Sequence, residues 1–340
     1  MKQQLFPATY IQFPPGYECR RAAFYLAAEE YVADHMPKGN YMLTWQIAPT
    51  VVMGRNQDAR AEIDLPFCRT EGIDVIRRKS GGGSIYADLG NIMTSLITDN
   101  GAVEPIFAEY SSAMAQCLSS LGAEVEVSGR NDIRISGGGK ICGNAFYHLA
   151  DRNIVHGTML YDTDARLMRG ALTPERAKLQ SKGVKSVESR ISLLKDTLPG
   201  LGVGKLREHI RHYLSNITIQ LSEADIHNIQ DIEAGYYATE YLYGKDTALM
   251  GERHCSYGRI EGCGTVSLEF CTEEGTVTSV IVRGDYFEFG NANAIFNQAF
   301  FGCTFNEAAL SEAAEKHKLH NCIRGLEHSS LCELIKRLFV

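Results

Sequence analysis

Residues 129–158 read GRNDIRISGGGKICGNAFYHLADRNIVHGT, a stretch that predicts a meander of short strands. The runs Ile133–Ile135 and Lys140–Cys142 are short and rich in isoleucine, and the SGGG segment between them is typical of a tight connection. Strand and helix patterns do not alternate regularly along the rest of the chain. Because a doubly wound fold needs that alternation, the sequence predicts an α+β fold with a mixed or antiparallel sheet flanked by helices.

Lys140 opens the second of these runs, directly after the glycines. Side chains alternate along a strand. We therefore expect two faces, one with Lys140, Cys142 and Asn144, the other with Ile141, Gly143 and Ala145. An ammonium held on a strand can stabilise charge that develops on an anionic substrate. Lys140 is thus the first candidate for a catalytic residue, against the alternative of an ordinary exposed lysine.

A second glycine run lies earlier, in residues 77–91, RRKSGGGSIYADLGN. Three cations precede three glycines, whose backbone N–H groups can turn toward a phosphoryl oxygen because no Cβ intervenes. The spacing matches neither a P-loop nor a dinucleotide fingerprint. The run indicates either a phosphate-binding loop of another kind or a glycine-rich turn beside a solvated basic stretch.

The composition is that of an ordinary soluble globular protein. Of its 340 residues, 44% are hydrophobic and 22% are charged, which allows two domains. The net charge of -7 argues against a general nucleic-acid binder. Ten cysteines without a C-x-x-C pair encode neither a zinc site nor a thioredoxin motif. We find no signal-peptide or membrane-span pattern, so we expect a cytoplasmic protein that binds no membrane.

Periodicity predicts the helices and strands in outline. Expected helices are Cys19–Met36, Glu104–Leu121 and Lys205–Leu214, and expected strands are Tyr41–Ala48, Thr50–Met53, Ile73–Arg77 and Ile92–Thr98. A change of pattern near 237–244 predicts domains at 1–243 and 244–340. The second is expected to be a small α+β domain with strands Gly258–Phe270 and Val277–Val282 and helices Ala292–Phe300, Asn306–His317 and Ser329–Leu338.

Taken together, the two glycine motifs and the HGT phrase at 156–158 resemble the signature of the lipoate-protein ligase A family. The likeness extends over nearly the whole chain, through YDTD at 161–164 and GDYF at 284–287. It implies a catalytic domain of the class II aminoacyl-tRNA synthetase and biotin protein ligase type, with a C-terminal accessory domain. It also implies a magnesium-dependent ligase that activates lipoate with ATP as lipoyl-AMP. The implied acceptors are lysines in 2-oxoacid dehydrogenase acyltransferase subunits and in the glycine cleavage H protein.

The resemblance also implies roles for single residues. Lys140 is the implied catalytic residue, and the implied ATP contacts are Arg78, Gly83, Ser84, Ile85, Tyr86 and Lys140. The implied lipoate contacts are Lys140, Asn91, His156 and Gly157. His156 is alternatively a buried histidine bonded to a backbone carbonyl. Asp132 is expected to orient the site or to hold Mg²⁺ through water, with a turn-capping role as the alternative.

Four positions depart from the commonest family pattern, namely Ser84, Ala87, Cys142 and Val155. Cys142 raises the alternative of a thiol nucleophile in an ATP-independent octanoyl or lipoyl transferase. A lipoate-binding protein without catalysis is a further alternative, whereas a biotin ligase is disfavoured because its Gly-Arg-Gly-Arg loop is absent. The basic segment 176–190, with five cations and one acid, resembles a mobile family segment near the nucleotide.

Overall fold

The computed structural model describes residues 5–129, 131–149, 151–172, 191–243 and 251–339. The strands are β1 (Ala8–Gln12), β2 (Tyr41–Trp45), β3 (Thr50–Met53), β4 (Asp74–Arg77), β5 (Ile85–Ala87), β6 (Asn91–Asp99), β7 (Val125–Ser128), β8 (Asp132–Ile135), β9 (Lys140–Leu149), β10 (Arg152–Leu160), β11 (Ser215–Gln220), β12 (Glu252–Ile260), β13 (Gly264–Glu273) and β14 (Thr276–Gly284). The helices are α1 (Ala22–His35), α2 (Ala59–Glu62), α3 (Leu65–Thr70), α4 (Val103–Ser119), α5 (Ala165–Ala171), α7 (Leu194–Thr197), α8 (Val203–Leu214), α9 (Glu223–Gly235), α10 (Thr239–Tyr243), α11 (Ala292–Phe300), α12 (Glu307–Lys316), the 3-10 helix η2 (Leu319–Cys322) and α13 (His328–Lys336).

The chain divides into two compact units. The larger consists of Met1–Met53, Ala59–Arg78 and Ser84–Leu242. The smaller consists of Tyr243–Val340 together with two loops from earlier in the sequence, Gly54–Asp58 and Lys79–Gly83. The glycine run 81–83 therefore belongs, by its contacts, to the smaller unit.

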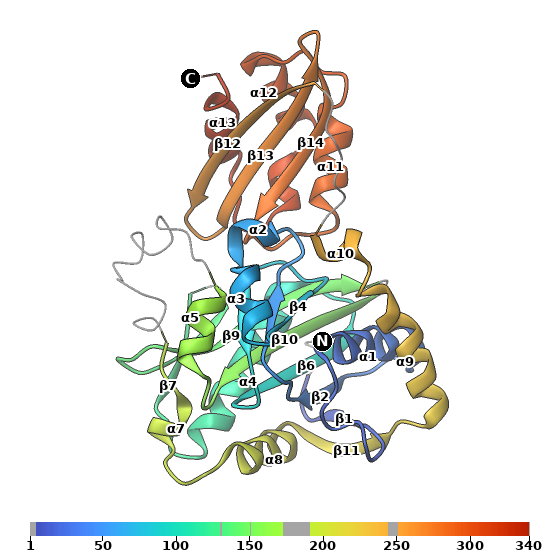
Figure 1. The fold of residues 1–340 in the computed structure, drawn as a ribbon, viewed down its shortest axis with the longest axis vertical. Helices are drawn as coiled ribbons and strands as arrows, with labels where there is room; N and C mark the ends of the chain where they lie inside the picture. Colours follow the sequence, from blue (N-terminus) through green and yellow to red (C-terminus); the bar gives the residue numbers. More distant parts are fainter. Residues whose placement is uncertain (1–4, 130, 150, 173–190, 244–250, 340) are drawn as a thin grey trace. The chain divides into compact units, whose positions relative to one another are not determined.

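The larger unit is built on an eight-stranded mixed sheet with the order β11-β1-β2-β6-β10-β9-β8-β7 (Figure 1). Strand β1 runs parallel to β11 and β2, and the other neighbours are antiparallel. Helix α1 packs on one face, with α9 beside it, and α4 and α8 pack on the other. The expected mixed sheet flanked by helices is confirmed.

A smaller sheet, β4-β3-β5, adds to the core on the α1 side. Its residues Val52, Ile76 and Ala87 join the cluster formed by α1 and the large sheet. Residues 22–33 of α1 are all buried, and its five alanines allow the helix to lie close to the strands. Because β4 ends at Arg77 and β5 begins at Ile85, the glycine loop connects two strands of this smaller sheet.

Most expected elements are confirmed within a few residues, including α1, α4, α8, α11, α12 and α13. The single strand expected over 258–270 is wrong. Strand β12 ends at Ile260 and β13 begins at Gly264, because Gly262 adopts φ +75° in the turn between them. Strands β1 and β11 and helix α9 were not expected. The basic segment 176–190 lies outside the described residues.

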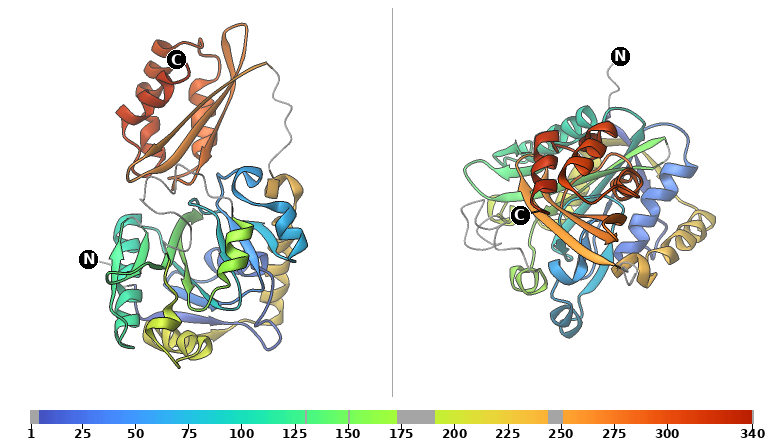
Figure 2. Two further views of the ribbon diagram at one scale, coloured as in Figure 1. Left: turned by 60° about the vertical axis from the view of Figure 1, so that its left-hand side comes forward. Right: turned by 90° about the horizontal axis from the view of Figure 1, so that it is seen from above.

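The smaller unit has its own hydrophobic core. Strands β12, β13 and β14 form an antiparallel sheet, and α11, α12 and α13 lie on one side of it (Figure 2). Phe270, Phe296 and Phe300 pack between the sheet and the helices. These elements match the small α+β arrangement expected for the C-terminal part.

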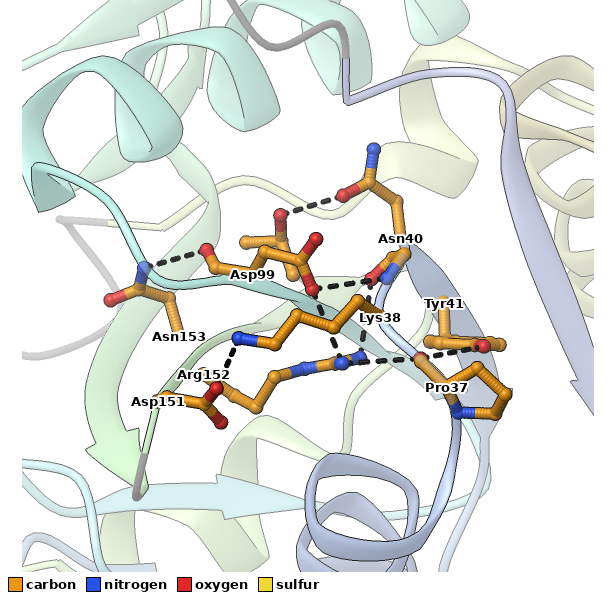
Figure 3. Close-up of polar contacts among 10 residues, drawn as sticks. Pro37, Lys38, Asn40, Tyr41, Asp99, Asp151, Arg152 and Asn153 are labelled. Carbon is orange, nitrogen blue, oxygen red and sulfur yellow. Dashed lines mark hydrogen bonds and ion pairs between the residues drawn. The ribbon is translucent and has the colours of Figure 1, made fainter.

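A buried arginine ties the ends of β6 and β10 to the loop after α1 (Figure 3). The Arg152 side chain is 2% exposed, and its Nη1 lies 3.2 Å from Asp99 Oδ1. Its guanidinium also donates to the carbonyl oxygens of Pro37 and Gly39, at 3.2 Å each. Removal of this cation would take the ion-pair partner from Asp99 and one donor from each carbonyl group. Among the described residues it would leave only the Gly39 N–H on the Asp99 carboxylate and the Tyr41 hydroxyl on Pro37.

We expect Arg152→Met to lower the free energy of unfolding by about 2–4 kcal/mol, because a buried ion pair loses one member. Lys38→Met is the matched control, since Lys38 pairs with Asp151 nearby and both side chains are mostly exposed. That control should change stability by less than about 0.5 kcal/mol. Chemical denaturation measures both; equal effects of the two substitutions would contradict a special role for Arg152.

Candidate functional site

One extra residue in β9 decides the direction of Lys140. In the β8–β9 ladder Ile133 pairs with Cys142 while Arg134 pairs with Lys140, so Ile141 has no opposite residue. Such a bulge reverses the alternation of side chains on the bulged strand. The expectation that Lys140 shares a face with Cys142 and Asn144 is therefore wrong.

Lys140 lies instead over Gly143. A Cβ on Gly143 would lie 2.4 Å from Lys140 Nζ. The lysine side chain can therefore occupy this position because Gly143 has no side chain. The ammonium forms an ion pair with Asp132 Oδ1 at 2.7 Å, and both side chains are partly exposed. The site thus presents a cation that is oriented by a neighbouring carboxylate and remains accessible to a ligand.

Cys142 and Asn144 lie on the opposite face, against α4. Gly157 pairs with Asn144, and a Cβ on Gly157 would meet Asn144 Oδ1, Tyr110 Oη and Cys142 Sγ within 2.2–3.3 Å. Burial raises the pKa of the Cys142 thiol to about 12. A thiol with that pKa is a poor nucleophile at neutral pH.

His156 joins a buried network on the Lys140 face. Its Nδ1 lies 3.1 Å from both carboxylate oxygens of Glu29, a fully buried residue of α1. Glu29 also accepts a hydrogen bond of 2.6 Å from Ser95 Oγ, which in turn accepts one of 3.0 Å from Trp45 Nε1. His156 pairs across the ladder with Ala145, two residues from Gly143 on the same face.

The alternative interpretation of His156 gave it a backbone carbonyl as partner, whereas the structure supplies a carboxylate. Glu29 and Trp45 were not singled out from the sequence. The sequence nevertheless contains a pattern that could have identified Glu29, because Glu29 and Glu30 interrupt an otherwise apolar, alanine-rich helix. Both acids are buried, and Glu30 accepts a hydrogen bond from Tyr236. A buried acid needs such donors, so an acid in an apolar helix face predicts a polar partner.

Asn91 is fully buried and holds a turn. Its Oδ1 accepts from the Asp88 backbone N–H at 3.0 Å and from Thr163 Oγ1 at 2.7 Å. Its Nδ2 has no hydrogen-bond partner among the described residues. The side chain therefore shapes the start of β6, and its contact with lipoate stays a prediction.

Arg78 is buried beside the smaller sheet. Its Nη1 donates to the carbonyl oxygen of Val52 at 2.9 Å, and burial lowers the pKa of its guanidinium to about 10. The group is thus still charged at neutral pH. Ile85 and Tyr86 begin β5 nearby in sequence, and the Tyr86 side chain is buried in the core between β3 and α5. These ATP contacts remain predictions.

Two glycines of the run 81–83 are needed for the conformation and packing of the loop itself. Gly82 adopts φ +87° and donates to the carbonyl oxygen of Tyr286 at 3.0 Å, within the smaller unit. A Cβ on Gly81 would lie 2.3 Å from the same oxygen. Two of the three glycines are therefore required by backbone geometry, whatever they bind.

The described residues do not form a metal centre by themselves. Among them, no group of three or more His, Cys, Asp or Glu side chains could hold a metal ion. Asp132, the residue expected to hold Mg²⁺, has the Lys140 ammonium as its neighbour. Its carboxylate thus has a different partner, and a role as metal ligand stays a prediction.

Comparison with known families gives two matches. The model of the lipoyl protein ligase A/B catalytic domain matches residues 21–215. The model of the bacterial lipoate protein ligase C-terminus matches residues 254–335. The first match falls on the larger unit and includes the two loops assigned to the smaller unit, and the second match falls within Tyr243–Val340.

Curated relatives cover the chain almost completely. Lipoate–protein ligase 1 of Staphylococcus aureus is 30% identical over 318 residues, which cover 91% of this chain and 95% of that protein. Lipoate-protein ligase LplJ of Bacillus subtilis is 29% identical over 321 residues, with the same coverage of 91% and 95%.

Solved structures share the fold. The complex of P. falciparum LipL1 with lipoate has a TM-score of 0.75 at 16% identity and covers 91% of this chain and 94% of that one. A lipoate-protein ligase A bound with ATP has a TM-score of 0.60 at 19% identity, over 70% of this chain and 98% of that one.

The raised pKa of Cys142 predicts low reactivity. At pH 8 only about one molecule in 10⁴ would carry the thiolate, so we expect iodoacetamide to label the exposed Cys19 and Cys255 first and to leave Cys142 unmodified in the folded protein. Mass spectrometry of the labelled peptides measures this. Full labelling of Cys142 in protein that keeps its native circular dichroism would contradict the buried, unactivated thiol.

Proposed function

We propose that this chain, which belongs to the lipoate-protein ligase family, activates lipoate with ATP and transfers the lipoyl group to a lysine of an acceptor protein. Family membership rests on the matching domain models and on a relative 30% identical over most of the chain. The chain is a lipoate-protein ligase, an ATP-dependent enzyme. Residues 1–243 are proposed as the catalytic domain and 244–340 as an accessory domain.

The observation that carries the proposed mechanism is the Lys140–Asp132 pair on an accessible sheet face. In the first step a lipoate carboxylate oxygen attacks the α-phosphorus of ATP and pyrophosphate leaves. In the second step the acceptor amine attacks the acyl carbon, loses a proton, and AMP leaves. An ammonium held between the carboxylate and the α-phosphate brings two anions together and stabilises the charge that builds at phosphorus.

The buried network of Glu29 and His156 supports a proposal for the direction in which lipoate binds. Trp45, Thr158 and His156 lie on the Lys140 face, since Trp45 and Thr158 both pair with Met93 and His156 lies two residues before Thr158. We place the dithiolane ring toward Trp45 and His156, and the carboxylate at Lys140. Gly157 faces the other way, so its proposed contact with lipoate is made by the main chain.

Arg78 and the run 83–86 are proposed to contact ATP. Mg²⁺ is proposed to enter the site bound to the phosphates of ATP. The glycine run gives weaker support to the proposed ATP contacts, because Gly81 and Gly82 are already required by backbone packing. No catalytic step is assigned to a protein-bound metal, in keeping with the surroundings of Asp132.

The proposed acceptors are lipoyl domains of 2-oxoacid dehydrogenase acyltransferase subunits and the glycine cleavage H protein. A protein of similar fold, a bipartite lipoate protein ligase from Thermoplasma acidophilum, belongs to an archaeal lipoylation system that includes its E2 lipoyl domain. Among the described residues no helix has the length and apolar character needed to cross a membrane. A cytoplasmic location is part of the proposal.

The alternatives make different predictions for one assay. A ligase exchanges labelled pyrophosphate into ATP when lipoate is present, whereas an ATP-independent transferase or a passive lipoate-binding protein does not. Repeating the assay with octanoate and biotin defines the acyl preference. The position of Cys142 on the α4 face, away from Lys140, already argues against the thiol-dependent transferase.

Lys140→Ala should lose both half-reactions, namely pyrophosphate exchange and transfer from preformed lipoyl-AMP. Removal of a cation that stabilises developing charge costs about 3 kcal/mol of barrier, more than a hundredfold in rate. Cys142→Ser is the control and should keep most of its activity. An active Lys140→Ala enzyme, or a well-folded Cys142→Ser enzyme without activity, would overturn the assignment.

Gly143→Ala should impair catalysis without unfolding the protein. The new methyl group would displace the flexible end of Lys140, so we expect less than about 1 kcal/mol of lost stability but at least a tenfold fall in adenylation rate. Gly204→Ala in α8 is the matched control, because a Cβ there meets no atom within 4 Å. Kinetics and melting curves for both variants test this, and equal rates would contradict the role of Gly143.

A further inference from the structure

A second cavity lies beside β1, β2 and α8, apart from the residues assigned to catalysis. Its volume is about 170 Å³. The walls contain the aromatic rings of Tyr10, Phe13, Tyr17 and Tyr25. Figure 1 places α8 next to β11, β1 and β2, at the edge of the large sheet. A cavity of about 150 Å³ accepts a benzene ring, so this space is large enough for one small ring.

Two guanidinium groups from α8 line this cavity. Arg207 and Arg211 are four residues apart and therefore lie on the same side of the helix. Arg211 stacks over the Tyr10 ring at 4.5 Å, and its Nη2 donates to Gln12 Oε1 at 3.2 Å and to Thr218 Oγ1 at 3.1 Å. Arg207 donates to Gln46 Oε1 at 3.4 Å. Throughout the described part of the chain no carboxylate forms an ion pair with either group.

The remaining polar groups of the cavity fit the same kind of ligand. Tyr10 Oη and Thr44 Oγ1 form a buried hydroxyl pair, 2.8 Å apart, on its wall. The one acidic wall residue, Glu18, is exposed, and its Oε2 accepts from the Gly16 backbone N–H. With two cations and one acid the wall carries a net charge of +1, in a chain whose net charge is -7.

The cavity is lined from both faces of the sheet, because Tyr10 and Thr44 lie on its α8 side whereas Phe13, Tyr17 and Tyr25 belong to the hydrophobic cluster around α1. Thr44 lines it, whereas the next residue, Trp45, points to the α1 face and the Glu29–His156 network. Tyr25 contacts both regions, since it lines the cavity and stacks on Trp45 with ring centroids 4.9 Å apart. Neither Lys140 nor the glycine run takes part in it.

We propose that this cavity is a second ligand site, which binds a small aromatic carboxylate. The ring of the ligand lies among the tyrosines and Phe13, and its carboxylate accepts hydrogen bonds from Arg207 and Arg211. Guanidinium–carboxylate pairs are directional and stronger than neutral hydrogen bonds, so the arginines select the anion and the aromatic wall selects the ring. This site goes beyond the ligase reaction and uses none of its proposed catalytic residues.

Benzoate is a suitable probe, and the protein carries its own reporter. Trp45 is the only tryptophan of the chain and stacks on Tyr25, so ligand binding beside Tyr25 should change its fluorescence. We expect saturable binding of benzoate to the full-length protein with a Kd of about 1 mM or below, by fluorescence and by calorimetry. Benzyl alcohol, which keeps the ring but lacks the charge, should bind at least about tenfold more weakly.

Substitutions locate the site. Arg207→Gln and Arg211→Gln should each weaken benzoate binding about tenfold or more, while Arg211→Lys should weaken it less because the charge is kept. Lys205→Gln is the matched control: it removes one positive charge from the same helix outside the cavity and should leave the Kd within about twofold. Melting temperatures confirm that each variant is folded.

Three results would overturn the proposal. Calorimetry could show no saturable benzoate binding to the wild-type protein up to about 50 mM. The folded Arg207→Gln variant could bind as tightly as the wild type, which would place the ligand elsewhere, including at the lipoate site. Benzyl alcohol could bind as well as benzoate, which would rule out selection by the arginines.

Discussion

The direction of Lys140, the residue proposed for catalysis, depends on one unpaired residue in a strand. Ile141 has no opposite residue in the β8–β9 ladder, and the bulge turns Lys140 to the face that carries His156, Thr158 and Trp45. Without it the ammonium would point at α4, into the side of the sheet that buries Cys142 and Tyr110. Gly143 completes the arrangement because it leaves room for the lysine beside Asp132.

The Lys140 face combines an accessible cation with a buried polar network. Burial raises the pKa of the Tyr147 hydroxyl, and the neighbouring Glu29 raises it further. Tyr147, Ser95 and His156 all direct polar atoms at the Glu29 carboxylate, which compensates that acid for its loss of water. A network of this kind holds its members in fixed positions, so the end of the proposed lipoate pocket is rigid while the Lys140 end stays open to reactants.

The two faces of the large sheet thus have different properties. On the α1 side, the alanines of the helix pack against the strands beside the buried Glu29 network. Beside α8, two arginines of this helix and aromatic residues from both sides of the sheet line a cavity. Strand β2 separates the two regions by the alternation of Thr44 and Trp45, and the Tyr25 ring reaches both. The same strand therefore borders both the face proposed for catalysis and the cavity proposed for a second ligand.

Local sequence patterns determined the helices with clear periodicity, the meander of short strands and the mixed sheet, because these depend on neighbours within a few residues. The same patterns made Lys140 the proposed catalytic residue. Only the tertiary structure decided the parallel pairing of β1 with β11. This pairing joins segments some two hundred residues apart and has no signature in the local sequence of either strand. It also decided the partner of His156 and the face of Lys140. A carboxylate from α1 meets β10 only after packing, and a bulge arises from pairing between two strands rather than from the composition of either one.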